Sequence, residues 1–156
     1  MSLYHSSNMI VENPDTRHSR QYLDFGRGFY LTTIHEQAVR YAQRFKRRGQ
    51  PAWLNIYELP DDIQRWKTHR FDSYDKDWLD FVSRCRDGAT IGDYDMIVGG
   101  IANDKVILTL DRYFMGEITQ EEALGLLKYE EPNIQYCIRS ERMLKECLTY
   151  IGSESI

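Results

Sequence analysis

The sequence predicts an α+β fold. Segments with helical spacing and segments rich in strand-forming residues follow one another without the strict alternation of a doubly wound parallel sheet. The 156 residues are 42% hydrophobic and 13% aromatic, which is enough for one sizeable core. Because the sequence shows no internal repeat, low-complexity tract or linker, we expect a single domain over residues 1–156.

The first expected elements are three strands and a helix. Residues 3–5 form a short strand candidate that turn-forming serine and asparagine residues end. A second strand is expected at 29–32, after a loop in which two glycines flank Arg27. A helix over 34–48 has apolar residues spaced by three and four, and glycine and proline at 49–51 end it. Residues 52–59 are rich in strand formers and stop at Pro60.

The middle of the chain is expected to contain two helices and a strand. A helix follows Asp72, because four apolar residues share one face: Trp78, Phe81, Val82 and Cys85. Residues 94–98 form a short apolar strand that closes on two glycines. Residues 106–114 have helical spacing that aligns Ile107, Leu110 and Phe114.

The last third is expected to form a helix, a strand and a final helix. Thr119 and Glu122 have the spacing of a capping box that opens a short helix. Alternation along 134–138 predicts two strand faces, with Ile134, Tyr136 and Ile138 on one and Gln135, Cys137 and Arg139 on the other. Ser140 is expected to cap the last helix. Residues 152–156 are polar and are expected to fray as a disordered tail.

Composition excludes several classes of function. The longest apolar run, 96–102, is too short to span a bilayer, and the start of the chain has no basic and apolar signal regions, so we expect a cytoplasmic protein. A net charge of -4 does not indicate a general nucleic-acid binder. Three widely spaced cysteines and four scattered histidines predict buried free thiols and no metal site.

Three segments carry the candidate functional residues. His5 stands beside Ser6 at a strand end, where an imidazole can bind a ribose diol, although a capping or surface histidine also fits. Tyr30 follows a glycine-relaxed loop, which suits stacking on a flat ring but also fits ordinary strand alternation. Gln135 is an amide on a late strand, where a plain edge or surface glutamine is the alternative.

The order of these segments resembles a known family. A strand with histidine is followed by Asp-Phe-Gly-x-Gly-Phe-Tyr-x-Thr-Thr over 24–33, and then by a helix that opens with Glu-Gln-Ala. Tyr-Asp-x-Ile-Val-Gly, Ala-Asn-Asp-Lys and a strand with an amide come later. Together they resemble a bacterial family of ADP-ribosyltransferase-like domains, long carried as a domain of unknown function, over residues 3–151.

The resemblance implies an ADP-ribosyltransferase-like split β-sheet core with surrounding helices and a cleft for NAD. His5 matches the histidine that holds ribose hydroxyls, and Tyr30 matches the tyrosine that stacks on nicotinamide. Arg20 and Arg27 flank the tyrosine motif and are expected to contact phosphates, with solvated loop arginines as the alternative. The expected cofactor-binding residues are His5, Ser6, Arg20, Gly28, Tyr30, Thr32, Thr33 and Gln135, with Tyr30 and Gln135 as catalytic residues.

The implied function is an NAD-dependent mono-ADP-ribosyltransferase with an unknown macromolecular acceptor, either protein or nucleic acid. Small bacterial proteins similar to this family are often encoded beside a small partner, so one hypothesis is a toxin with a small antitoxin protein. Relatives carry glutamate where this chain has Gln135, and an amide cannot act as a general base. The alternative is therefore a catalytically silent NAD- or nucleotide-binding module, or a protein-interaction module, on the same fold.

One charged segment stands outside this set of residues. The cations of the first expected helix, at 40, 44, 46, 47 and 48, have no acid between them. Cations near a helix C-terminus are stabilised by the helix dipole, which is the structural interpretation. The functional interpretation is a patch for an acidic protein partner or a nucleic acid.

Overall fold

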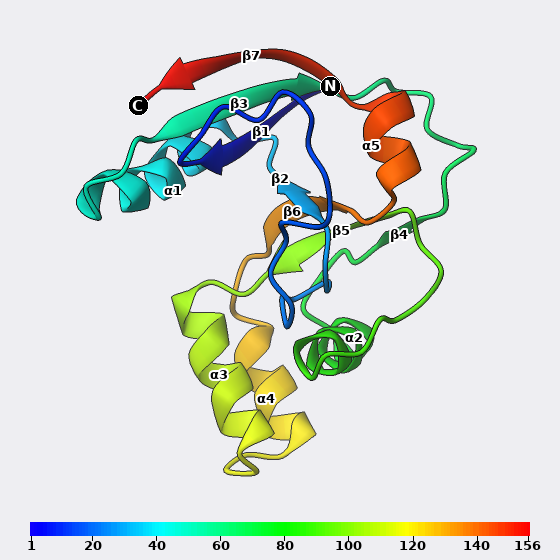
Figure 1. The fold of residues 1–156 in the computed structure, drawn as a ribbon. Helices are drawn as coiled ribbons and strands as arrows, with labels where there is room; N and C mark the ends of the chain where they lie inside the picture. The colour runs from blue at the N-terminus through cyan, green and yellow to red at the C-terminus, as the bar shows by residue number, and fades with distance from the viewer.

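The computed structural model describes residues 1–156 and contains seven strands and five helices (Figure 1). The strands are β1 (Ser2–Ser7), β2 (Phe29–Leu31), β3 (Trp53–Glu58), β4 (Thr68–Arg70), β5 (Met96–Ile101), β6 (Asn133–Ile138) and β7 (Thr149–Ser155). The helices are α1 (His35–Arg47), α2 (Lys76–Arg86), α3 (Asp104–Phe114), α4 (Gln120–Leu127) and α5 (Glu141–Cys147). The predicted α+β class is confirmed.

The strands form two sheets. A three-stranded antiparallel sheet has the order β1-β3-β7, and a four-stranded sheet has the order β2-β6-β5-β4. In the four-stranded sheet only β4 and β5 are parallel. The two sheets meet at one point, where Tyr4 and Thr32 exchange two backbone hydrogen bonds of 2.8 and 3.0 Å. The end of β1 that carries His5 therefore lies beside the end of β2.

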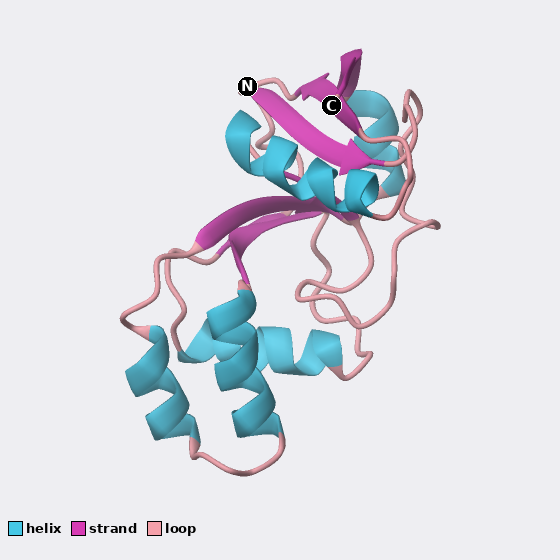
Figure 2. Cartoon of the chain, turned by 90° about the vertical axis from the view of Figure 1, so that its left-hand side faces the viewer, coloured by secondary structure: helices cyan, strands magenta, loops and turns pink.

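Two apolar clusters cover the two faces of the four-stranded sheet. One cluster lies between the sheets and includes Leu3, Phe29, Tyr57 and Ile138 together with residues of α5. The other joins Cys137 to α2, α3 and α4, which extend below the sheet in Figure 1. The predicted alternation of β6 is confirmed, since its odd- and even-numbered residues pack into different clusters. Helix α1 lies against the three-stranded sheet (Figure 2).

Several local predictions are confirmed by the hydrogen bonds at helix starts. Thr119 and Glu122 form both bonds of a capping box at α4. The Ser140 hydroxyl accepts from the Met143 N–H at the start of α5. All three cysteines are free and buried. None of the five helices combines the length and apolar character needed to cross a membrane.

Three predictions need correction. Residues 152–156 do not fray, because all but Ile156 belong to β7, whose backbone pairs with the edge of β3. Helix α3 buries Val106 and Leu110, whereas Phe114 ends the helix beyond the core and is 43% exposed. Strand β4 was not expected, because its three residues, two of them exposed, show no strand pattern of their own. Pairing with β5 makes it a strand.

Candidate functional site

His5 lies at the junction of the two sheets. Its Nδ1 is 2.8 Å from the Tyr30 carbonyl oxygen, and its ring lies on Phe29 with centroids 4.2 Å apart. Burial lowers the pKa of His5, and the hydrogen bond to Tyr30 opposes that shift only in part. The imidazole is therefore neutral at pH 7. Because a carbonyl only accepts, Nδ1 carries the proton, and Nε2 offers a lone pair to a hydroxyl donor.

Two predicted hydroxyl residues beside His5 hold helix α1 in place. Ser6 donates to the Ala38 carbonyl at 2.5 Å, and Thr32 donates to Gln37 at 2.6 Å. Thr32 is buried, and its hydroxyl also accepts from the Ile34 N–H. The exposed Thr33 makes no side-chain hydrogen bond. Ser6 and Thr32, which were predicted to bind the cofactor, thus lie at the junction with their hydroxyls already bonded within the chain.

The Tyr30 side chain lies on the other face of β2 from the His5 ring. Its hydroxyl donates to the Gly26 carbonyl at 2.6 Å and accepts from the Phe25 N–H at 3.1 Å. Its ring is parallel to that of Phe25 within 5°, with centroids 6.4 Å apart. Burial raises the pKa of Tyr30, so the phenol stays protonated. The hydroxyl fixes the loop before β2, and the imidazole touches Tyr30 through its backbone only.

Gln135 lies on β6, directly beside β2. It pairs with Gly99 of β5, and its neighbour Tyr136 pairs with Leu31. Alternation places its side chain on the same face as Cys137, the face that Tyr30 also uses. The amide is partly buried and makes no hydrogen bond to another residue. Its donor and acceptor are therefore free for a ligand.

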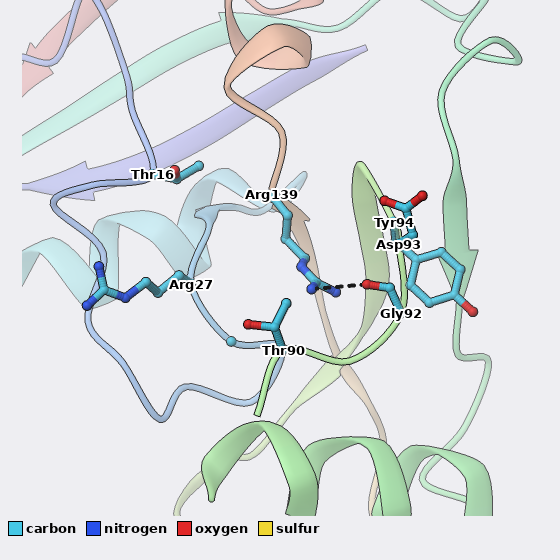
Figure 3. Close-up of a pocket in the computed structure, with 8 residues that line it drawn as sticks. Thr16, Arg27, Thr90, Gly92, Asp93, Tyr94 and Arg139 are labelled. Carbon is cyan, nitrogen blue, oxygen red and sulfur yellow. Dashed lines mark hydrogen bonds between the residues drawn. The ribbon is translucent and has the colours of Figure 1, made fainter. Parts of the chain in front are cut away.

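A hollow of about 270 Å³ lies by the loop before β2 (Figure 3). Its lining includes two arginines, Arg27 and Arg139, neither of which forms an ion pair. Arg139 donates to the Ile91 carbonyl at 2.7 Å, while the Arg27 guanidinium extends away from it in Figure 3. The remaining lining residues are Thr16, Gly26, Thr90, Gly92, Asp93 and Tyr94. The Arg139 guanidinium, which its hydrogen bond holds at the hollow, suits a phosphate-bearing ligand, and the exposed Arg27 side chain can turn toward the same ligand.

The structure separates the other predicted residues from this hollow. Arg20 is exposed and does not line it. A Cβ at Gly28 would lie 2.4 Å from Cys137 Sγ, so glycine is needed there for the close approach of β2 to β6. Arg139 was missed as a site residue, although its position on the Gln135 face of the strand was expected. The strand face that Arg139 shares with Gln135 was the sequence feature that could have identified Arg139 as a site residue.

His5 also makes stability depend on pH. The pKa of His5 in the folded state is below its usual value of 6.5. The contribution of neutral His5 to the free energy of unfolding is therefore complete above pH 6.5, and it is lost as pH falls through the lowered pKa. We expect urea unfolding to show lower stability below pH 6. The His5→Gln variant can still donate to Tyr30 but does not titrate, so its stability should fall less over the same range. Parallel curves for the two proteins would contradict this assignment.

Comparison with known proteins gives one match. A family model described as "Protein of unknown function (DUF3990)" matches residues 1–150. The matched region contains every candidate residue from His5 to Arg139. No curated protein and no solved structure matches the chain.

Proposed function

The chain belongs to the family described as "Protein of unknown function (DUF3990)", and we propose that it is an NAD-dependent mono-ADP-ribosyltransferase on an ADP-ribosyltransferase-like fold. The observation that carries the proposal is the neutral imidazole of His5, bonded through Nδ1 to Tyr30 where the two sheets meet. Its free Nε2 suits a ribose hydroxyl. The motif order from His5 to Gln135 supplies the resemblance to this class of enzyme.

The site residues would contact different parts of NAD. His5 Nε2 would accept from a ribose hydroxyl, and the unbonded amide of Gln135 would orient a second hydroxyl. Arg27 and Arg139 would contact the pyrophosphate from the hollow beside the loop. Tyr30 would act indirectly: its ring lies on the other face of β2 from His5, and its hydroxyl bond to Gly26 would hold the loop that carries Arg27.

The proposed reaction replaces one bond at the ribose. The bond between ribose C1 and the nicotinamide nitrogen breaks, and its electron pair leaves with nicotinamide, which becomes neutral. The acceptor's nucleophile bonds to the same carbon and releases a proton. Positive charge develops on the ribose, as in other glycosyl transfers, and the leaving group needs no general acid. Binding and orientation are therefore the main demands on the protein.

Gln135 favours a second candidate function. An amide can orient a hydroxyl but cannot take the proton of the acceptor. A catalytically silent NAD-binding module would need the residues that contact NAD, but no group that activates an acceptor. The two functions differ in one observable, which is the release of nicotinamide from bound NAD.

NAD binding and nicotinamide release test the proposal. Calorimetry should show binding to the wild-type protein, and His5→Ala should weaken it roughly tenfold, the value of one hydrogen bond. His18→Ala is the matched control, because His18 is exposed and paired only with Asp15. Equal affinity of the His5 variant and the wild type would remove His5 from the site. Induced expression in bacteria tests the toxin hypothesis, since growth arrest should depend on His5.

Restoring a carboxylate at position 135 should increase turnover. We expect Gln135→Glu to raise nicotinamide release and label transfer about a hundredfold, at the low end of what a general base contributes. The Gln135→Ala variant is the control and should not gain activity. Tight NAD binding without turnover in wild type and Gln135→Glu alike would favour the silent module over the enzyme.

A further inference from the structure

Helix α1 carries five cations without a single ion pair. All five side chains are exposed, and none of them takes part in a salt bridge; the only ion pair of α1 joins His35 to Glu154. The five residues are Arg40, Arg44, Lys46, Arg47 and the C-cap residue Arg48. The whole chain has a net charge of -4, so this concentration is local. The helix dipole accounts for cations in the last turn, but not for Arg40 in the middle of the helix.

Three of these residues form what we call the α1 stripe: Arg40, Arg44 and Arg47. Their spacing of four and three residues places them on one helix face, over about 10 Å along the axis. Ala38 and Ala42 are the buried residues of α1. No other element covers the outer side of α1, which lies in front of its sheet in Figure 2. The stripe is therefore open to a partner along its length.

Two further features adjoin the stripe. The Arg44 guanidinium lies over the Tyr41 ring, 4.9 Å from its centroid, so this arginine is held flat instead of reaching for a carboxylate. A shallow hollow that is open to solvent is lined by His35, Glu36, Val39 and Arg40. Glu36 and Glu154, which contacts His35, make the first turn less attractive to phosphates. The stripe would thus bind phosphates, and the hollow would bind an uncharged group.

We propose that the α1 stripe binds a single-stranded nucleic acid, with phosphates on its arginines and a base in the hollow. Arginine planes that bind phosphates and stack on bases are typical of such surfaces. An acidic protein surface would use the charges but would leave the hollow and the flat Arg44 unexplained. A duplex keeps its bases stacked, so it could not fill the hollow.

The position of α1 extends the proposal to the acceptor, a step that rests on the proposed function. Ser6 and Thr32 bond to the first turns of α1, and both residues adjoin His5 at the sheet junction. The stripe faces away from the sheet, so a bound strand would reach the ribose of bound NAD by continuing past the first turn of α1. Its nucleophile would form the new bond to ribose C1 and release the proton, as written above.

Fluorescence anisotropy without NAD tests the binding. The probes are labelled single-stranded RNA and DNA of about 12 nucleotides, the matching duplex, and polyglutamate. The stripe variant is Arg40→Glu/Arg44→Glu/Arg47→Glu. Its matched control, Lys76→Glu/Lys105→Glu/Lys145→Glu, makes the same charge change at three other exposed, unpaired cations. Thermal unfolding checks that both variants remain folded.

We expect the wild type to bind a single strand, and the stripe variant to lose at least tenfold in affinity. The slope of log affinity against log salt should fall by about 2, which corresponds to three phosphate contacts. The control should stay within about threefold of the wild type. Comparison of the affinities for RNA and DNA then shows which of the two nucleic acids the stripe binds. Absence of wild-type binding at low salt, an equal loss in the control, or tighter binding of duplex or polyglutamate would overturn the proposal.

The acceptor role has a separate readout. With labelled NAD, the label should appear on the bound strand and should be lost in the stripe variant, while NAD affinity stays unchanged. Nicotinamide release without label on the strand would overturn the acceptor role and leave the proposed function standing. Absence of nicotinamide release would overturn both, whereas the anisotropy result would stand by itself.

Discussion

Replacing Asn55 by alanine is expected to lower the free energy of unfolding by about 3 kcal/mol, through three lost hydrogen bonds. Asn55 is fully buried in β3. Its Oδ1 accepts from the Val11 N–H at 2.9 Å and from the Ser153 hydroxyl at 2.7 Å, and its Nδ2 donates to the Met9 carbonyl at 3.2 Å. One amide thus joins β7 and the segment after β1 to β3.

Urea unfolding would measure the loss. Asn8→Ala is the control, since Asn8 is exposed beside the same segment and makes no side-chain hydrogen bond, so we expect a change below about 0.5 kcal/mol. Asn55 pairs with His5 across the sheet, so Asn55→Ala should also weaken NAD binding if the proposed site is right. A cost below about 1 kcal/mol would show that water replaces the three bonds.

Replacing Asp24 by alanine is expected to cost a similar amount, about 3 kcal/mol. The buried Asp24 carboxylate accepts from the Ala102 N–H at 2.7 Å and pairs with Arg86 Nε at 3.0 Å. It therefore joins the loop before β2 to the end of β5 and to α2. Alanine would leave the Arg86 charge and the Ala102 N–H without this partner.

The Asp24→Asn variant separates the charge from the hydrogen bonds. Burial raises the pKa of Asp24 despite its two partners, so ionisation is less favourable there than in water. Stability from this group is therefore complete below its usual pKa and declines as pH rises through the raised value. Asparagine keeps the acceptor for Ala102 and should cost only about 1 kcal/mol at pH 7.

An exposed ion pair provides the control for Asp24. Asp93 is 95% exposed and bonds to Lys67 at 2.8 Å, so Asp93→Ala removes a carboxylate that water already solvates. Its cost should lie below about 1 kcal/mol. Equal losses for Asp24→Ala and Asp93→Ala in urea unfolding would contradict the structural role assigned to Asp24.

The sequence predicted most elements because their signals are local. The capping box at Thr119 and the breakers after α1 need no tertiary information, and both predictions hold. The polar residues of β7 and the three residues of β4 have no such signal. They become strands because a neighbouring strand offers an edge with unpaired backbone groups, and that edge exists only in the folded chain.

The candidate site was predictable in its residues but not in their directions. The motif order indicated His5, Tyr30 and Gln135, and strand pairing does bring their backbones together. The sequence could not show that the imidazole would reach the Tyr30 carbonyl while the phenol turned to the opposite face. The directions of these two side chains depend on where β1 meets β2. The single bridge between Tyr4 and Thr32 fixes that meeting point.

The order of strands around His5 has a consequence for synthesis on the ribosome. β3 lies between β1 and β7, so the sheet that holds His5 combines residues 2–7 with residues 149–155. Such distant partners cannot meet until the late strand has left the exit tunnel. A nascent chain that lacks β7 would miss the Ser153 bond to Asn55 and remain unfinished at the site. The sheet that holds His5 can therefore be completed only after residues 149–155 have been translated.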